Sequence, residues 1–141
     1  MFVDADGQML QGVSTDTHRG VGVPGSVDGM LALLDRYGTL PRGDVLAPAI
    51  ALARDGFTVS YALAGSLTRS ERLRRFTTSV EAFGLADGPR MGDRLAQPAL
   101  ASTLEAIARE GRDGFYRGPV ADLIVADMQA NGGLISHEDL V

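Results

Sequence analysis

Glycine divides this 141-residue sequence into short segments, and that division restricts the folds open to the chain. Five stretches carry apolar residues three or four positions apart, the spacing of helices that bury one face. Four of the five are followed by a glycine, at Gly38, Gly56, Gly111 and Gly132. Glycine ends helices because it adopts the left-handed conformation without a steric penalty. The sequence therefore predicts a mainly α fold of about five helices.

The ends of these helices are predicted from capping residues. Ser26, Asp44 and Ser60 are expected N-caps, because their side-chain oxygens can accept a hydrogen bond from an unpaired amide of the first turn. Pro98 and Pro119 suit the start of a helix, where the missing amide is not needed. The predicted helices cover residues 26–37, 44–55, 60–75, 97–110 and 118–130.

The remaining segments are predicted to be turns and loops. Residues 2–10 place short apolar ends around an Asp-Gly turn, which is typical of a hairpin. Residues 11–26 are expected to form a polar connection, and residues 77–96 a loop with one helical turn near 80–83. Ser136, with an acidic residue three positions later, marks the start of another helix. We therefore expect the natural chain to continue past Val141.

Charge and composition exclude several classes of protein. The net charge is −5, so the basic surface of a nucleic-acid binder or a polybasic membrane-surface protein is not expected. No cysteine occurs, which excludes cysteine-ligated zinc, iron–sulfur clusters and thiol nucleophiles. No apolar run reaches the length of a membrane span.

Two loops resemble ligand sites at first sight. The segment from Gly20 to Gly25 matches G-x-G-x-x-G, and Asp44 follows at about the distance of a ribose-binding carboxylate. The residues before it do not resemble a buried strand, so a tight turn entering a helix is favoured over a dinucleotide site. Asp4 and Asp6 suggest a calcium loop, but Gly7 comes too early for that spacing.

Nucleophiles and metal ligands are equally sparse. The two histidines, His18 and His137, have no second histidine at helical spacing, so surface positions are expected for both. Three hydroxyl residues precede His18 in sequence, and Thr77-Thr78-Ser79 forms a second hydroxyl-rich string. No Gly-x-Ser-x-Gly elbow occurs, and adjacency in a loop does not by itself indicate catalysis. The hydroxyl residues near His18 are Ser14, Thr15 and Thr17.

A set of segments in one order resembles the large subunit of gamma-glutamyltranspeptidases. It begins with Gly22-Val23-Pro24-Gly25 and the four residues that follow, and it continues through the run Gly114-Phe115-Tyr116-Arg117-Gly118. The other matching segments are residues 36–41, 46–57, 92–98, 104–111 and 132–140. Together they extend across the chain.

The resemblance implies an N-terminal nucleophile hydrolase with a four-layer αββα fold. In that family a precursor cuts itself, and the threonine exposed at the new N-terminus attacks while its own amine serves as the base. The enzyme takes a γ-glutamyl group from glutathione or a related donor and passes it to water, an amino acid or a peptide. The implied partners are the rest of the precursor and a small γ-glutamyl substrate. A periplasmic or extracellular location is implied, and no cofactor.

The resemblance assigns no catalytic, substrate-binding, cofactor-binding or metal-binding residue to this chain. The family's nucleophile belongs to a Thr-Thr-His motif and its donor-binding arginine to an Arg-Glu-x-x-Pro stretch, and neither string occurs here. Thr77-Thr78-Ser79 lacks the histidine. We therefore expect residues 1–141 to be one internal, inactive segment of the large subunit, truncated at both ends. Exposed apolar faces, dye binding or self-association should follow.

Three alternatives remain open at this point. A cephalosporin-type acylase of the same superfamily would differ in its donor pocket. A helical interaction module without catalysis would end naturally after Val141. A dinucleotide binder would respond to titration with a nicotinamide cofactor.

Overall fold

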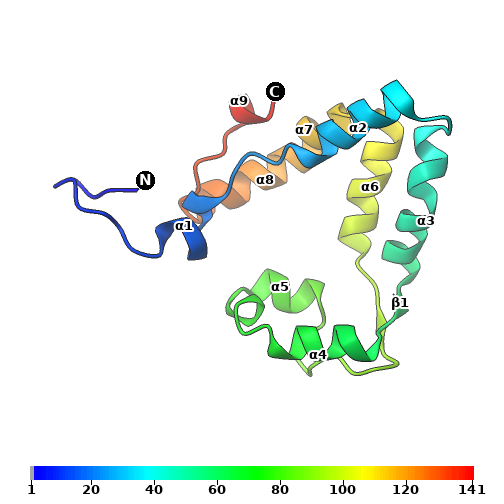
Figure 1. The fold of residues 1–141 in the computed structure, drawn as a ribbon, viewed down its shortest axis with the longest axis horizontal. Helices are drawn as coiled ribbons and strands as arrows, with labels where there is room; N and C mark the ends of the chain where they lie inside the picture. The colour runs from blue at the N-terminus through cyan, green and yellow to red at the C-terminus, as the bar shows by residue number, and fades with distance from the viewer. Residues whose placement is uncertain (1) are drawn as a thin grey trace. The chain divides into compact units, whose positions relative to one another are not determined.

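The computed structural model describes residues 2–141, and this part of the chain is mainly helical (Figure 1). It divides into two compact units, residues 1–42 with 106–141 (unit 1) and residues 43–105 (unit 2). The elements in chain order are α1 (Val13–Asp16), η1 (His18–Gly20), α2 (Ser26–Tyr37), α3 (Arg42–Asp55), β1 (Phe57–Thr58), α4 (Tyr61–Arg69), η2 (Leu73–Arg75), α5 (Thr77–Ala82), β2 (Arg94–Leu95), α6 (Pro98–Glu110), α7 (Asp113–Tyr116), α8 (Gly118–Ala130) and α9 (His137–Leu140), where η denotes a 3-10 helix.

Unit 1 is built around α8, with α2, α7 and α9 packed against it (Figure 1). One face of α8 is buried because its apolar residues recur at helical spacing. Val27 of α2 and Phe115 of α7 pack against this core from the neighbouring helices. The buried residues of the core are Tyr116, Ala121, Val125, Met128, Ile135 and Leu140.

The N-terminal residues of unit 1 form the predicted hairpin. Val3 and Met9 make an antiparallel bridge, and the amide of Asp4 donates to the carbonyl of Gln8 at 2.9 Å. The turn depends on Gly7, whose φ of 77° is in the left-handed region. The hairpin prediction is confirmed.

Unit 2 contains most of α3, the first part of α6 and the elements between them. A short antiparallel ladder joins β1 to β2 in the register Phe57 with Leu95 and Thr58 with Arg94. The amide of Gln97 donates to the carbonyl of Ala53 at 2.7 Å, so the start of α6 is tied to the end of α3. A small cluster of Val59, Ala64, Leu95 and Leu63 is the apolar centre of the unit.

The five predicted helices correspond to α2, α3, α4, α6 and α8, and several of their ends differ from the prediction. Ser26 is the first residue of α2 rather than its N-cap, which is Gly25. Helix α3 starts two residues before Asp44, at Arg42, because the guanidinium of Arg42 fixes this end by donating to the carbonyls of Ala108 and Arg109. Asp44 therefore lies in the first turn, where its charge still suits the helix dipole.

The third predicted helix is too long. The Ser60 cap is confirmed, since its hydroxyl accepts from the amide of Leu63 at 3.2 Å, but α4 ends at Arg69 rather than near Arg75. Ser70 follows with ψ of 73°, which breaks the helix, and its hydroxyl donates to the carbonyl of Ser66 at 2.9 Å. A separate 3-10 turn, η2, then covers Leu73–Arg75.

Both predicted loops contain additional structure. Residues 11–26 were expected to be a connection without helices, and they hold α1 and η1, because Gly12 starts a turn at φ 76° and Thr17 caps the next one. Residues 77–96 hold a longer helix than the expected single turn, α5, and the strand β2. Strand pairing depends on distant partners, which a local pattern does not reveal. The total number of helices between residues 2 and 141 therefore exceeds the expected five, because several short helices were not predicted.

Large apolar side chains are exposed in both units, among them Met30 and Leu33 in unit 1 and Tyr61 and Met91 in unit 2. The expectation of exposed apolar faces is confirmed, while dye binding and self-association stay predictions. Over the described residues, no helix has both the length and the apolar character needed to cross a membrane.

Candidate functional site

The glycine-rich segment that resembled a dinucleotide loop has a structural explanation. Residues 13–20 form α1 and η1 rather than a strand, as expected, and α2 begins directly after Gly25. A Cβ at Gly20 would lie 2.6 Å from the carbonyl oxygen of Ser14, so the close approach of α1 requires glycine there. The predicted entry into a helix is confirmed, but residues 21–25 form an irregular connection rather than the expected tight turn.

The hydroxyl residues near His18 make local backbone contacts. The hydroxyl of Thr17 donates to the carbonyl of Val13 at 2.7 Å and accepts from the amide of Arg19 at 3.3 Å. The hydroxyl of Thr15 donates to the carbonyl of Gly12 at 3.1 Å. These are capping contacts of α1 and η1.

The other two polar candidates are also part of regular structure. Thr77, Thr78 and Ser79 form the first half of α5. The carboxylate of Asp4 accepts from the amides of Asp6 and Gln8, at 3.0 and 2.8 Å, and so closes the hairpin turn. The Asp4 carboxylate therefore stabilises the backbone of its own turn.

Each histidine is paired with an aspartate of α8. Nε2 of His18 lies 3.1 Å from Oδ2 of Asp127, and Nε2 of His137 lies 2.8 Å from Oδ1 of Asp122. The two pairs join η1 and α9 to positions five residues apart on the same helix. Among the side chains that the structure describes, no three of the types His, Cys, Asp and Glu gather closely enough to hold a metal ion.

The densest polar junction lies in unit 1, around Tyr116 and Arg112. The Tyr116 side chain is buried; its hydroxyl donates to the carbonyl of Pro24 and accepts from the amide of Asp28 at 3.2 Å. Nε of Arg112 donates to the carboxylate of Asp28 at 2.9 Å, and its guanidinium lies 4.8 Å from the centre of the Tyr116 ring. Nη2 of Arg112 reaches the carbonyl of Leu140 at 3.4 Å. The start of α2, helix α7 and helix α9 thus meet at two side chains.

This junction brings together three of the segments that resemble the family. The turn before α2 supplies Pro24 and Asp28, the Gly-Phe-Tyr-Arg-Gly run supplies Tyr116, and the final segment supplies Leu140. Gly114 belongs to the same run, and a Cβ there would lie 2.2 Å from the carbonyl oxygen of Ala106. Arg112 carries no sequence motif of its own, and only its position next to this run could have suggested a role.

A carboxyl group at the start of α9 has a lowered pKa. Oδ2 of Asp139 accepts from the amide and the hydroxyl of Ser136, both at 2.8 Å. The backbone hydrogen bond, followed by the hydroxyl, lowers the pKa of Asp139 from its ordinary value of 3.8, since both bonds favour the charged carboxylate. The predicted capping arrangement at Ser136 is confirmed.

Comparison with known proteins gives matches over the whole chain. The family model described as gamma-glutamyltranspeptidase matches residues 1–141. A glutathione hydrolase proenzyme of Escherichia coli (strain K12) is 45% identical over 143 residues, covering 99% of this chain and 25% of the relative. The chain thus spans about a quarter of the length of the curated relatives it matches.

Solved structures agree with the sequence matches. Helicobacter pylori gamma-glutamyltranspeptidase superposes with a TM-score of 0.92 at 40% identity, over 99% of this chain and 41% of that one. A cephalosporin acylase from Bacillus halodurans gives a TM-score of 0.78 at 34% identity, over 85% of this chain and 24% of that one.

Proposed function

The chain belongs to the gamma-glutamyltranspeptidase family, and from this membership we propose that it is part of a precursor enzyme that cleaves the γ-glutamyl bond of glutathione and related donors. The acyl group passes to water, an amino acid or a peptide. The observation that carries the proposal is the match to a glutathione hydrolase proenzyme at 45% identity over 99% of this chain.

The proposed chemistry uses a threonine at the N-terminus of the small subunit, which the family resemblance implies. Its hydroxyl attacks the γ-carbonyl carbon of the donor, its α-amine accepts the hydroxyl proton, and backbone amides stabilise the oxyanion. The proton then goes to the departing amine, which leaves a γ-glutamyl ester. Water or an acceptor amine attacks this ester, and the threonine hydroxyl is regenerated.

The role proposed for residues 1–141 is structural. They form one segment of the large subunit and part of the helical layer of a four-layer αββα fold, and the reacting groups lie in other parts of the precursor. In support, the polar candidates Asp4, Thr15 and Thr17 all have partners within the local fold. A periplasmic or extracellular location is proposed from the family alone.

The test is release of glutamate from glutathione by two preparations. We expect the longer precursor to process itself and release glutamate, and the 141-residue chain to release none. A precursor in which alanine replaces the implied N-terminal threonine is the matched control, and it should remain unprocessed. Turnover by the 141-residue chain alone would overturn the structural role.

A cephalosporin acylase is the competing enzyme of this fold, because a structure of that name superposes on 85% of the chain. Both enzymes cleave an amide through an acyl intermediate, so the donor decides between them. The same precursor is therefore tested with glutathione and with an N-acylated cephalosporin. Preferred cleavage of the cephalosporin would replace the glutathione assignment and leave the precursor proposal in place.

A further inference from the structure

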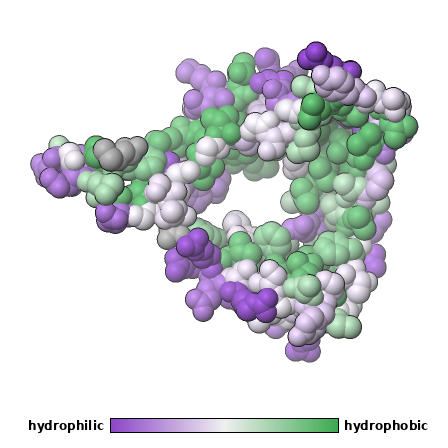
Figure 2. Space-filling model, in the orientation of Figure 1, coloured by the Kyte–Doolittle hydropathy of each residue, from purple (hydrophilic) through white to green (hydrophobic). Residues whose placement is uncertain are grey.

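Asn131 is the one asparagine of the sequence, and a glycine follows it directly. Both Asn131 and Gly132 are exposed, in the turn that leads from α8 to α9. Hydrophilic residues reach the surface over α9 in the view of Figure 2, so this end of unit 1 is open to water. Among the described residues, none accepts a hydrogen bond from the Gly132 amide. The Gly132 nitrogen is therefore free to react.

The side chain of an asparagine can be attacked by the backbone nitrogen of the next residue. The Gly132 nitrogen forms a bond to Cγ of Asn131 and loses its proton, while the carboxamide nitrogen takes up a proton and leaves as ammonia. Glycine favours this step because no Cβ shields its nitrogen. The product is a five-membered cyclic imide, which water opens at either carbonyl to give aspartate or isoaspartate. Water is the only co-reactant.

Contacts with Asp127 hold the Asn131 side chain away from this reaction. Nδ2 of Asn131 donates to the carbonyl of Asp127 at 2.9 Å and to its Oδ1 at 3.1 Å. The ψ of Asn131 is 14°, which directs the Gly132 nitrogen away from Cβ, whereas the ring requires the two to be eclipsed. The amide of Gly133 also fixes the turn, because it donates to the carbonyl of Met128 at 2.7 Å. The last turn of α8 must therefore open before the ring can close.

We propose that Asn131 is a site of deamidation, and that its contacts with Asp127 set the rate. The aspartate product cannot donate to Asp127, and it adds a second negative charge at the negative end of the α8 dipole. The isoaspartate product lengthens the backbone next to Gly133, where even a Cβ would lie 2.4 Å from Sδ of Met128. Either product loosens the connection between α8 and α9.

Ageing the full precursor in ¹⁸O-labelled water at neutral pH tests the site, since peptide mapping by mass spectrometry detects the label at residue 131. We expect conversion there, slower than in an unfolded peptide of residues 127–136. Asp127→Ala should speed the conversion about two- to tenfold, the effect of losing one hydrogen bond. No conversion over several half-lives of the peptide, or a rate equal to that of the peptide, would overturn the proposal.

Asp122→Ala is the matched control for Asp127→Ala. Asp122 lies on the same helix and also contacts a histidine, but it makes no contact with Asn131. Both carboxylates are more than half exposed, so neither substitution empties the core. Asp122→Ala should leave the rate at residue 131 unchanged. Equal rates in the two variants would show that Asp127 does not control the reaction.

The effect of the product is measured separately with Asn131→Asp. This variant should speed hydrogen exchange at the amides of residues 133–140 in the precursor, and added salt should reduce the difference from the wild type because it screens the new charge. Gln129→Glu is the control, since it adds the same charge at an exposed position of α8 and removes no donor to Asp127. An equal effect of both variants, or slower exchange in Asn131→Asp, would refute the loosening.

Discussion

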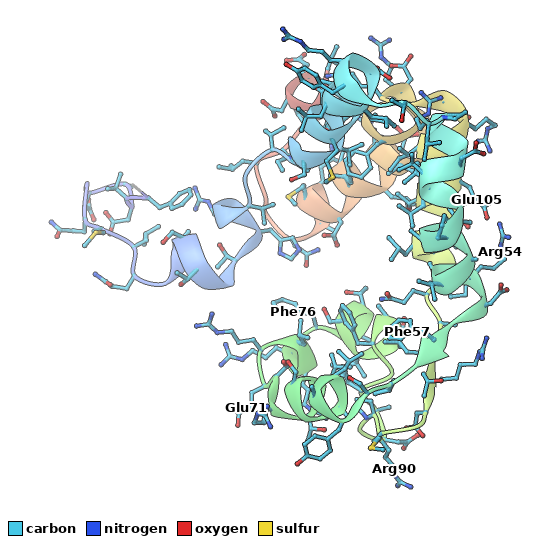
Figure 3. The ribbon with its side chains drawn as sticks, turned by 45° about the vertical axis from the view of Figure 1, so that its right-hand side comes forward. Arg54, Phe57, Glu71, Phe76, Arg90 and Glu105 are labelled. Carbon is cyan, nitrogen blue, oxygen red and sulfur yellow. The ribbon has the colours of Figure 1, made fainter. Side chains whose placement is uncertain are left out.

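Unit 1 and unit 2 are held together in different ways. Unit 1 has one continuous core of six buried residues, and a polar junction at Arg112 and Tyr116 ties three helices to it. Unit 2 has a cluster of three buried residues, a four-residue ladder and the ion pair of Arg54 with Glu105 that Figure 3 shows between α3 and α6. Exposed ion pairs contribute little to stability. The buried side chains of unit 1 therefore form one connected core, whereas unit 2 combines a smaller cluster with separate buried side chains and weak polar contacts.

The charges of the units differ as well. Unit 1 holds six arginines and eleven acidic residues, a net charge of −5, whereas unit 2 holds seven of each and is neutral. Repulsion within unit 1 is reduced where acidic residues have cationic partners, as Asp28 has in Arg112 and Asp113 has in Arg117. Ion pairs in unit 1 thus oppose a charge excess that unit 2 does not have.

The largest expected effect comes from removing the junction of unit 1. Tyr116→Ala should lower the free energy of unfolding by about 3–5 kcal/mol, because it empties the site of a large buried ring. Tyr116→Phe keeps the ring but leaves the Pro24 carbonyl and the Asp28 amide without their partner, at a cost of about 1–3 kcal/mol. Chemical denaturation measures both values.

The matched control is Tyr61→Ala in unit 2, where the side chain is 80% exposed. It should change stability by less than about 0.5 kcal/mol. Hydrogen exchange should show that Tyr116→Ala loosens the amides of α2, α7 and α9 first. Uniform loosening across both units would contradict a junction that belongs to unit 1.

The next effect tests unit 2 at its most buried side chain. Leu85 is 0% exposed, its amide donates to the carbonyl of Val80 at 2.9 Å, and its carbonyl accepts from Arg74 at 2.7 Å. Leu85→Ala should cost about 2–3 kcal/mol, the lower part of the usual range, because a sparse core collapses more easily around a missing side chain. If denaturation gives a loss as large as that of Tyr116→Ala, the contrast between the units is wrong.

Two glycines of unit 1 sharpen the comparison within one unit. At Gly114 a Cβ would lie 2.2 Å from a backbone oxygen, so Gly114→Ala should destabilise by about 1–3 kcal/mol. At Gly29 in α2 no atom lies within 4 Å of the added Cβ, and Gly29→Ala should stabilise by about 0.5–1 kcal/mol through helix propensity. Thermal unfolding measures both, and the same sign for both would refute the packing at Gly114.

Periodicity and capping predict the long helices but not how they are joined. The ends of α6 and α8 are as expected, since Pro98, Gly111 and Pro119 act locally. The β1–β2 ladder was missed because residues 59–93 separate its two strands in sequence, and local patterns do not show which distant strands pair. Tyr116 belonged to a family motif, but its partners in α2 could be identified only from the structure.

The smallest expected effect is a pH dependence at the start of α9. Hydrogen bonds from Ser136 lower the pKa of Asp139 below 3.8 in the folded state, so the folded protein binds this proton more weakly than the unfolded chain does. The stabilisation is therefore complete above pH 3.8 and is lost as the pH falls through the lowered folded value. Asp139→Asn removes this contribution at every pH. The unfolding midpoints of the wild type and Asp139→Asn, measured from pH 6 to about pH 2, should converge as the pH falls.

The control is Glu138→Gln, which removes a neighbouring charge that accepts no hydrogen bond from Ser136. The difference between its midpoint and that of the wild type should not show the convergence expected for Asp139→Asn. A difference in unfolding midpoint between the wild type and Asp139→Asn that stays constant down to the lowest pH would contradict this prediction. It would mean that the charge of Asp139 does not contribute to the stability of the cap, and that unit 1 gains no pH dependence from it.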